Sequence, residues 1–303
     1  MKTNRLGKSE LYVSEIGLGT MSLGTDRDKA VSLIHDALDN GVNFIDTADL
    51  YDFGLNEEIV GEALKGRRDS VVLATKAGNH WEEGKDGWFW DPSKQHIKNA
   101  IKNSLRRLKT DYLDLLQLHG GTIEDPIDET IEAFEELKEE GLIREYGISS
   151  IRPNVIREFV KRSSIASVMM QYSILDRRPE EEILDLLHDN SISVIARGPL
   201  AKGMLSDRYE EKVKEDGFLD YSKFDVLETA KQLSALKGDS RNLTQTSLRY
   251  ALAHPAVATV IPGASKSEQL LANLTAQNAP DLTPDEVRQI REASRANKYE
   301  KHR

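Results

Sequence analysis

The feature of this sequence that most limits its fold is an alternation of short apolar runs with amphipathic stretches. The apolar runs lie at 16–19, 43–46, 71–76, 112–118, 146–149, 167–172, 193–197 and 257–261. Stretches with helical spacing follow at 26–40, 55–64, 93–108, 127–140 and 179–189, and from 153 and 267 onwards. Strands that alternate with helices build a parallel sheet with helical crossovers. Eight strand–helix units close a (β/α)8 barrel, and 303 residues suit one such domain.

Segments outside this rhythm predict the remaining architecture. Residues 5–13 are typical of a small β-hairpin ahead of the first barrel strand. A long loop is expected over 77–92, a longer insertion over 198–241 with its own helix at 225–237, and a frayed tail over 298–303. We therefore expect a single domain over 1–303, an α/β TIM barrel with an N-terminal hairpin, a long insertion after strand seven and an extra C-terminal helix at 284–296. The runner-up, an open doubly wound sheet, is disfavoured because no G-x-G-x-x-G follows the first run.

Composition and charge narrow the function. The 41 basic and 51 acidic side chains give a net charge of −10 with both signs interspersed, which disfavours nucleic-acid binding. No apolar run reaches the roughly 20 residues needed to cross a bilayer, and the first residues lack the apolar segment of a signal peptide. The absence of cysteine excludes disulfides and thiolate metal sites. The histidines other than His119 are expected singly, so no metal site is predicted. We expect a cytoplasmic protein that acts on small molecules.

Polar side chains stand where three neighbouring strands of the predicted barrel end. Asp46 ends the second strand, Lys76 ends the third and His119 follows the fourth, while Tyr51 lies five residues past Asp46. Each alone is more often structural: a packed tyrosine, a hydrogen-bonded histidine, or an ion pair. Because active sites of such barrels are built at the C-terminal ends of the strands, the four together favour a catalytic site.

The chemistry that this set suits is proton donation to a carbonyl oxygen. A tyrosine hydroxyl is a weak acid, and a lysine ammonium beside it stabilises the phenolate left behind. An aspartate fixes the lysine, and a histidine within hydrogen-bond reach orients the substrate oxygen. Groups that only move a proton need a cofactor that supplies electrons.

Motifs along the chain resemble one family. They are Gly17-Leu18-Gly19-Thr20-Met21, the stretch from Phe44 to Tyr51, Gly61-Glu62-Ala63-Leu64, Thr75-Lys76, Leu118-His119, Gly141-Leu142-Ile143-Arg144 and Tyr146-Gly147-Ile148-Ser149. From about residue 5 to residue 296 the chain is similar to the aldo-keto reductases, in particular to a bacterial NADPH-dependent branch related to the potassium-channel β-subunit-like members. This resemblance implies NADPH-dependent reduction of aldehydes and ketones, with Tyr51 as general acid, Lys76 and Asp46 tuning it, and His119 orienting the carbonyl.

The resemblance also implies a set of cofactor contacts along the rim of the barrel. They are Gly19, Thr20, Met21, Asp46, Ser149, Ser150, Gln171, Arg197, Gly198, Leu200, Lys202, Gly203, Arg208, Gly263, Ser265, Lys266, Gln269 and Asn273. Residues 198–203 are expected to hold the pyrophosphate, because backbone N–H groups and basic side chains suit phosphate. Ser265 and Lys266 at a helix N-terminus suit a 2′-phosphate, which favours NADPH over NADH.

Four positions depart from the family pattern. Ser150 stands where asparagine is common, and Met169 where a glutamine usually meets the carboxamide, with Gln171 two residues on as a possible replacement. Ala272 stands where a glutamate commonly contacts adenine. Arg197 replaces an aromatic residue against the nicotinamide. A guanidinium can stack on an aromatic ring, but it repels the oxidised nicotinamide ring, which carries a positive charge. We therefore expect NADP⁺ to bind more weakly than NADPH.

The substrate and the oligomeric state are less constrained. Trp88, Phe53 and Met21 are expected to wall an apolar pocket for a small carbonyl substrate; packing on the barrel rim is an equally good interpretation of the loop aromatics. A monomer is favoured weakly. Two alternative functions stay open: a regulatory protein that senses NADP(H) with little turnover, and an isomerase or aldolase with Lys76 as Schiff base. Asp46 beside Lys76 disfavours the last, since it would keep the amine protonated.

Overall fold

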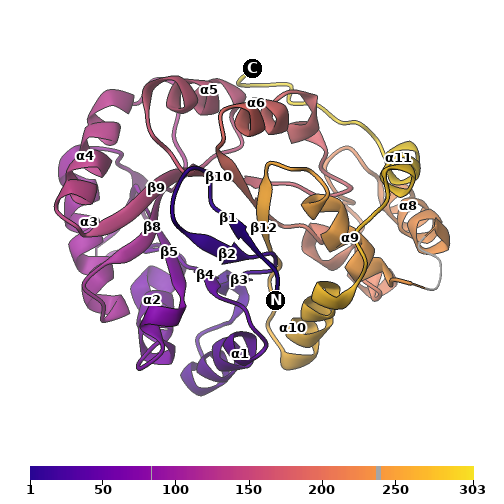
Figure 1. Ribbon diagram of the computed structural model, residues 1–303, viewed down its shortest axis with the longest axis horizontal. Helices are drawn as coiled ribbons and strands as arrows, with labels where there is room; N and C mark the ends of the chain where they lie inside the picture. Colours follow the sequence, from indigo (N-terminus) through magenta and orange to yellow (C-terminus); the bar gives the residue numbers. More distant parts are fainter. Residues whose placement is uncertain (83, 237–239) are drawn as a thin grey trace.

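Eight parallel strands form the centre of the protein, in a computed structural model that describes residues 1–82, 84–236 and 240–303 (Figure 1). They are β3 (Leu18–Gly19), β4 (Phe44–Asp46), β5 (Val72–Ala77), β8 (Leu113–Leu118), β9 (Ile143–Ser149), β10 (Ser167–Gln171), β11 (Ser193–Arg197) and β12 (Val257–Ile261). Each pairs in parallel with its neighbour in this order. Parallel bridges from Ile16 to Val260 and from Gly19 to Gly263 join the first strand to the last. The predicted barrel is confirmed, and an open doubly wound sheet is excluded.

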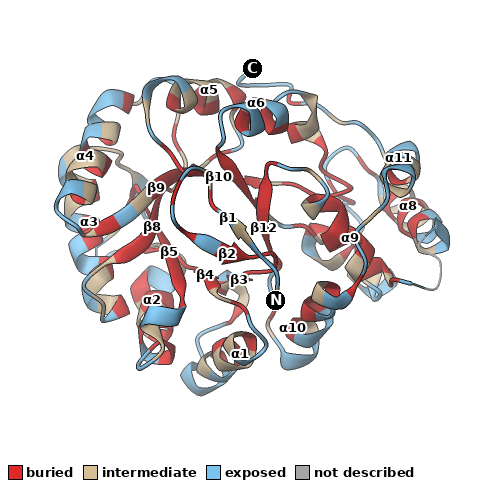
Figure 2. Ribbon diagram, viewed as in Figure 1, coloured by how far each residue is buried: buried red, intermediate tan, exposed pale blue. Residues whose placement is uncertain are grey.

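Helices surround the barrel and follow its strands. The main ones are α1 (Arg27–Asp39), α2 (Leu55–Ala63), α3 (Lys94–Leu108), α4 (Ile127–Glu139), α5 (Pro153–Arg162), α6 (Ile183–Asp189), α9 (Leu243–Leu252) and α10 (Ser267–Leu274). Their inner faces are buried and their outer faces exposed, as Figure 2 shows by the red and pale blue sides of each ribbon. Caps set some boundaries: the side chains of Asp26 and Ser93 accept hydrogen bonds from the first turns of α1 and α3. None of the described helices is long and apolar enough to cross a membrane.

Short 3-10 turns complete the chain between these elements. They are η1 (Thr20–Ser22), η2 (Tyr51–Gly54), η3 (Arg68–Ser70), η4 (Arg178–Glu181), η5 (Ala201–Gly203) and η6 (Thr275–Asn278). The helix expected over 179–189 is therefore divided into η4 and α6. The turns η2 and η5 both carry functional candidates.

An antiparallel hairpin closes the N-terminal end of the barrel. It is formed by β1 (Thr3–Arg5) and β2 (Tyr12–Ser14), slightly wider than the predicted 5–13. Leu6, Leu11 and Val13 are buried against the side chains that fill the barrel. Gly7 turns with φ +59°, and a Cβ there would lie 2.3 Å from the carbonyl oxygen of Ala166, so only glycine fits. Because the hairpin covers the N-terminal end of the barrel, the rim at the C-terminal ends of the strands is the end open to ligands.

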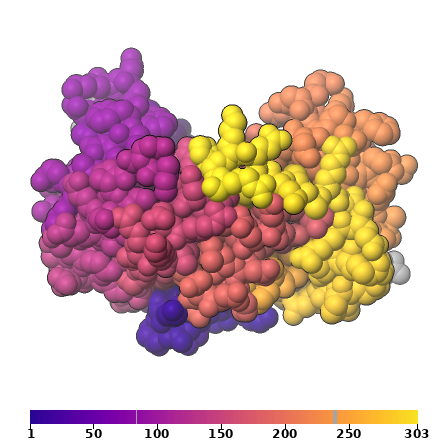
Figure 3. All heavy atoms as spheres, turned by 90° about the horizontal axis from the view of Figure 1, so that it is seen from above, coloured from indigo at the N-terminus to yellow at the C-terminus, as the bar shows by residue number. Residues whose placement is uncertain are grey.

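Two insertions project from that opposite rim. The segment over 77–92, expected as a loop, contains the antiparallel pair β6 (Asn79–His80) and β7 (Phe89–Trp90). The insertion after β11 contains α7 (Tyr209–Lys212) and α8 (Lys223–Leu236). The helix expected over 225–237 thus begins two residues earlier, and Lys237 lies outside the described residues. In Figure 3 these segments form the purple and orange projections, on the side away from the indigo hairpin.

The C-terminal segment differs from its prediction. The extra helix α11 covers Pro284–Glu292 and ends earlier than residue 296. The tail over 298–303 is not frayed. Tyr299 is 6% exposed, and the Arg178 guanidinium lies 4.9 Å above its ring. The backbone N–H of Asn154 donates to the carbonyl of His302 (2.9 Å). A buried aromatic ring therefore anchors a segment whose charges alone predicted solvation.

Candidate active site

A buried ion pair joins the ends of two neighbouring strands. The Lys76 ammonium at the end of β5 lies 2.7 Å from the Asp46 carboxylate at the end of β4. The same ammonium donates to the carbonyl oxygen of Thr47 (2.7 Å) and to the hydroxyl of Tyr51 (3.3 Å). Its three N–H groups therefore all have protein acceptors. Burial lowers the pKa of Lys76, but Asp46 and Tyr51 outweigh this effect, so its pKa lies above the usual value and the ammonium stays charged.

Tyr51 is held over this pair by a strained turn. It begins η2, and the two residues after it, Asp52 and Phe53, adopt left-handed backbone angles with φ +48° and +50°. Gly54 follows with φ +89°. Consecutive left-handed positions in residues other than glycine are unfavourable, and such strain gathers at functional sites. The turn gives the phenol its place at the rim, with the Lys76 ammonium 4.9 Å from the ring centroid.

His119 completes the cluster from the next strand. Its backbone N–H donates to the carbonyl of Ala77 (2.8 Å), which continues the β5–β8 ladder past the end of β8. Its ring meets that of Tyr51 edge-on, with 5.9 Å between centroids. Burial, helped by the positive charges of Lys76 and Arg197, lowers the pKa of His119 to about 3, so the ring is neutral at neutral pH. Its Nδ1 is buried and has no partner among the described residues.

Gln117 is a member of the cluster that sequence reasoning missed. Its side-chain amide donates to the second carboxylate oxygen of Asp46 (3.1 Å), and so holds the partner of Lys76. The signal was a single polar residue inside the apolar run 112–118, two positions before His119 and therefore on the same face of the strand.

An open cleft of about 790 Å³ runs from this cluster across the rim to the start of α10. Most of the predicted site residues line it: Gly19, Met21, Asp46, Tyr51, Lys76, His119, Ser149, Ser150, Gln171, Arg197, Gly198, Leu200, Lys202, Gly203, Arg208, Gly263, Ser265, Gln269 and Asn273. Four predicted residues are not among those that line it: Thr20, Phe53, Lys266 and Trp88. These residues lie in the same cleft because they come from the ends of the strands and from the insertion after β11.

These four residues lie elsewhere for physical reasons. Thr20 is buried, and its hydroxyl donates to the carbonyl oxygen of Asp46 beneath the cleft. Lys266 is the exposed N-cap residue of α10. Phe53 packs edge-on against Trp81, and Trp88 is 54% exposed. The expected aromatic wall is thus not formed by Phe53 and Trp88 in this arrangement.

Two of the departures from the family pattern, Met169 and Arg197, line the cleft together with Gln171. Met169 lies on its floor, 1% exposed. Arg197 donates to the side-chain carbonyl of Gln171 (3.2 Å), and the Gln171 amide donates to Asp176 (2.8 Å). Gln171 was proposed as a replacement for the usual carboxamide contact. Both its side-chain oxygen and its side-chain nitrogen already have hydrogen-bond partners within the protein.

A chain of contacts links this region to the tail. Asp176 accepts two hydrogen bonds from the Arg178 guanidinium, each 2.7 Å, and Arg178 covers the ring of Tyr299. The hydroxyl of Tyr299 is buried with no partner among the described residues. The position of Gln171 in the cleft thus depends on a segment more than a hundred residues further along the chain.

The loop after β11 has an unusual backbone. Gly198, Ala201, Lys202 and Gly203 all have positive φ, between +45° and +90°. Ala201 and Lys202 adopt these angles although they carry a Cβ, which is unfavourable outside a functional constraint. Residues 198–203 all line the cleft, so the loop with these backbone angles forms part of its wall.

The far end of the cleft lies at the start of α10. The backbone N–H and hydroxyl of Ser265 both donate to the side-chain oxygen of Gln269, at 2.9 and 3.1 Å. Arg208 lines the same part of the cleft and pairs with Glu211. Glu268, in the first turn of α10, is a lining carboxylate that the sequence-based set did not include.

A second cluster lies outside the cleft. His80 and His96 were expected singly, but their rings stack with centroids 4.5 Å apart, and Asp91 lies beside both. The expectation was wrong because the β6–β7 hairpin reverses the chain and returns residue 91 to residue 80 before α3 begins. Sequence spacing alone gives no sign of this meeting.

Comparisons with known proteins agree with this geometry. The model of the aldo/keto reductase family matches residues 15–295, so the chain belongs to this family of oxidoreductases. It is 56% identical to the uncharacterized oxidoreductase YqkF of Bacillus subtilis (strain 168), over 100% of both chains. The holo form of aldo-keto reductase AKR11C1 from Bacillus halodurans superposes with a TM-score of 0.95 at 55% identity, covering 100% of this chain and 99% of that one. The NADH-specific methylglyoxal reductase of Escherichia coli (strain K12) is 31% identical over 98% and 99% of the two chains.

The residues of the cleft fit the nicotinamide dinucleotide that this family uses. The strained loop after β11 lines the cleft, and the basic side chains of Lys202 and Arg208, which also line it, suit phosphate. At one end, His119 and Tyr51 line the cleft side by side, where a carbonyl would react. At the other, the N-terminus of α10 suits a phosphate or ribose oxygen.

Proposed function

We propose that this protein reduces aldehydes or ketones to alcohols with NADPH, and that Tyr51 is the general acid. The observation that carries the proposal is the Lys76 ammonium, whose three N–H groups are directed to Asp46, Thr47 and Tyr51 inside a buried site. A charge fixed beside the phenol stabilises the phenolate that forms when the proton leaves. The site contains no nucleophile–base pair that would favour hydrolysis.

Each side chain has a part in this reaction. When bound, the reduced nicotinamide supplies the hydride. The Tyr51 hydroxyl donates its proton to the carbonyl oxygen, and the Lys76 ammonium holds the negative charge left on the phenol oxygen. Neutral His119 orients the carbonyl oxygen through a ring nitrogen, because a protonated ring would require a pH near its pKa of about 3. Asp46 keeps Lys76 in place, and Gln117 keeps Asp46 in place.

The preference for NADPH over NADH rests on the end of the cleft at α10. Arg208 and Ser265 line it, and Lys266 stands exposed at the helix N-cap. These groups suit a 2′-phosphate dianion. Glu268 in the same turn opposes an added phosphate, and the Escherichia coli relative is named for NADH. The expected result is a lower KM for NADPH than for NADH.

A panel of carbonyl compounds tests the activity. Oxidation of NADPH and of NADH is followed by absorbance with short and bulky aldehydes and ketones. Turnover with NADPH supports the proposal, and turnover with NADH alone reverses the cofactor preference. Tight NADPH binding without turnover on any carbonyl would favour the alternative, a regulatory protein that senses NADP(H). Borohydride trapping with a carbonyl should leave no adduct on Lys76, since the buried ion pair keeps its amine protonated.

Arg197 sets a preference between the two redox forms of the cofactor. Its guanidinium lies in the cleft near His119 and Asp46 and adds positive charge there. Because the nicotinamide ring becomes positive on oxidation, we predict that NADP⁺ binds more weakly than NADPH. The variant Arg197→Met should tighten NADP⁺ by about three- to tenfold and leave NADPH nearly unchanged. Fluorescence titration with both forms measures this, and equal dissociation constants in the native protein would contradict it.

The remaining expectations are also proposals. The carbonyl substrate enters beside His119 and Gly120, next to the ring of Trp90. A Cβ at Gly120, which lines the cleft, would lie 3.4 Å from that ring, so we propose Trp90 rather than Trp88 as the tryptophan beside the substrate. We further propose that the chain forms one domain over 1–303 and acts as a cytoplasmic monomer without nucleic-acid or membrane partners. Sedimentation tests the oligomeric state directly.

A further inference from the structure

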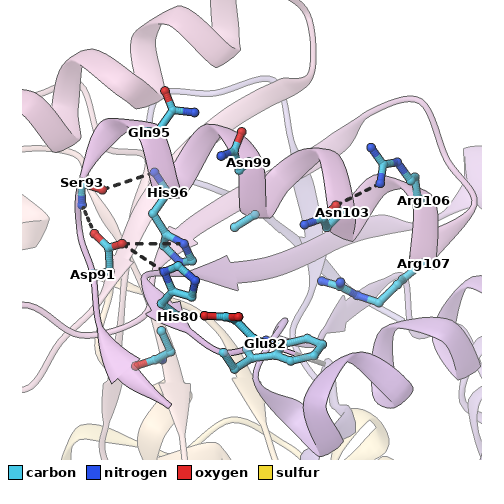
Figure 4. A pocket seen from close by; sticks show the side chains of 13 residues that line it. His80, Glu82, Asp91, Ser93, Gln95, His96, Asn99, Asn103, Arg106 and Arg107 are labelled. Atoms are coloured by element: carbon cyan, nitrogen blue, oxygen red, sulfur yellow. Dashed lines mark hydrogen bonds and ion pairs between the residues drawn. The ribbon is translucent and has the colours of Figure 1, made fainter. Parts of the chain in front are cut away.

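A cluster of two imidazoles and one carboxylate lies on the outside of the barrel, away from the reductase cleft. His80 ends β6, Asp91 follows β7, and His96 lies in the first turn of α3. Asp91 Oδ2 is 3.2 Å from Nδ1 of His80 and 4.0 Å from Nδ1 of His96. One potential ligand atom from each of the three residues lies within 4.8 Å of the others. Figure 4 shows the three side chains converging at one end of a cavity of about 640 Å³.

The surrounding structure orients each of these side chains. The other carboxylate oxygen of Asp91, Oδ1, accepts a hydrogen bond from the backbone N–H of Ser93 (3.1 Å), so Oδ2 is turned to the histidines. The ring of His80 lies between the rings of Phe89 and His96, with centroid distances of 4.6 and 4.5 Å. Nε2 of His96 is buried and has no partner among the described residues. The hydrogen bond to Asp91 and the ring stacking on His80 are supporting contacts of the kind that orient ligands in metal sites.

Two imidazole nitrogens and one carboxylate oxygen are a donor set for a borderline divalent metal. Zn²⁺ binds histidine nitrogen and carboxylate oxygen at about 2.0–2.2 Å, and sites with three protein ligands hold water in the remaining position. We propose that His80, Asp91 and His96 form a Zn²⁺ site, built from residues that do not line the catalytic cleft. The metal would take the place of the proton shared by His80 Nδ1 and Asp91 Oδ2.

Binding requires one adjustment of the side chains. The two histidine rings are nearly parallel, with an interplanar angle of 13°. A metal must lie in the plane of each ring that binds it, so one ring turns about its Cβ–Cγ bond. His80 is the ring that turns, because its side chain is 32% exposed whereas that of His96 is 11% exposed, and the Phe89 ring stacked on His80 must move with it.

The site joins two elements that otherwise meet through side-chain packing. His80 belongs to the β6–β7 hairpin and His96 to α3, so a bound metal would fix the hairpin to the helix. The same hairpin carries Trp90, whose indole N–H donates to Asp125 (3.0 Å) and whose ring lies against Gly120 at the mouth of the cleft. Zn²⁺ would therefore stabilise the wall beside which we place the substrate.

The test uses the full chain, stripped of metal with a chelator and then titrated with ZnCl2. We expect saturable binding of one Zn²⁺ by calorimetry, a melting temperature that rises with Zn²⁺ concentration, and slower amide exchange in β7 and the first turn of α3. His80→Gln and His96→Gln should each weaken binding by at least about tenfold. His188→Gln, at an exposed histidine on α6, is the matched control and should bind as the native protein does.

A second probe separates a built site from loose surface binding. Co²⁺ in a site with imidazole and carboxylate ligands gives visible absorption bands that are absent from the aqueous ion, and these bands should vanish in His80→Gln. Turnover without added metal should be equal in the native protein and in His80→Gln, which also shows that the variant folds. Equal Zn²⁺ affinity in the native protein, His80→Gln and His188→Gln, or no binding at all, would overturn the proposal whether or not the reductase activity is found.

Discussion

The two halves of the barrel rim hold their polar groups in opposite ways. On β4, β5 and β8, the side chains of Asp46 and Lys76 are 3% and 1% exposed and bond to each other. Beyond β11, Arg208 is 63% exposed and pairs with its neighbour Glu211. A buried cluster keeps its geometry before any ligand arrives, whereas solvated groups gain their best partners from the ligand itself. The first half is thus preorganised for chemistry, and the second is arranged for binding.

The largest expected effect comes from the chemical half. Tyr51→Phe removes the transferable proton and leaves the ring, so turnover should fall by about 10²–10⁴-fold. Binding of NADPH should change little, because the hydroxyl bonds to Lys76 inside the cluster. Steady-state kinetics and cofactor fluorescence measure the two effects separately. Tyr12→Phe, on the hairpin at the opposite end of the barrel, is the control; an equal loss in both variants would remove Tyr51 from its role.

Lys76 should matter for stability as well as activity. Lys76→Met leaves the buried Asp46 carboxylate without its cation, which should lower the free energy of unfolding by about 3–5 kcal/mol. Adding Asp46→Asn removes the stranded charge and should recover at least about 1 kcal/mol while turnover stays absent. Urea unfolding of the two variants checks this. If the double variant is no more stable than the single one, the Asp46 carboxylate is not stranded in a buried site when Lys76 is removed.

His119 predicts a pH dependence of stability. Its pKa is about 3 in the folded protein and about 6.5 in the unfolded chain, so below pH 6.5 the unfolded chain binds the extra proton. The stabilising contribution is complete above about pH 6.5 and is lost as pH falls toward 3, by up to the order of 4 kcal/mol. Urea unfolding between about pH 7 and pH 4 measures the slope. His119→Gln should flatten the curve, and parallel curves for both proteins would refute the assignment.

The smallest effect on the fold is expected in the binding half. Arg208→Gln should weaken NADPH binding by about tenfold at low salt and by less at high salt, because its charge is exposed and screened. The unfolding midpoint should stay unchanged, in contrast to Lys76→Met. Titrations at two salt concentrations, with Arg288→Gln on α11 as control, test this difference. If Arg208→Gln lowered the stability of the protein, the proposed difference between the two halves of the rim would be contradicted.

The barrel and the meeting of polar side chains at its rim could be predicted because they depend on local pattern. Eight apolar runs and their polar ends specify which side chains meet at the rim, and Asp46, Lys76 and His119 follow from that rule. Gln117 was missed although the same rule covers it, because one polar residue in an apolar run resembles an ordinary interruption. Sequence spacing also gives no backbone angles, so the left-handed turn after Tyr51 was not foreseen.

The expectations that failed depend on contacts between distant segments. His80 and His96 meet only because the β6–β7 hairpin folds back on itself. Tyr299 is buried because a guanidinium more than a hundred residues earlier offers it a surface. Trp88 was favoured for the substrate pocket as an aromatic residue of the loop over 77–92; it is exposed and does not line the cleft, and its contact with substrate stays a prediction.

The seam that closes the barrel has a consequence for how the chain is made. The N–H of Gly17 donates to the carbonyl of Val260, so the first strand finds its second neighbour only after some 240 further residues exist. At the pace of a ribosome this takes tens of seconds. During that interval the strand that contains Leu18 has an unpaired edge. An incomplete barrel of this kind is prone to aggregate. A chain that stops before Val260 therefore leaves this edge of the first strand permanently unpaired.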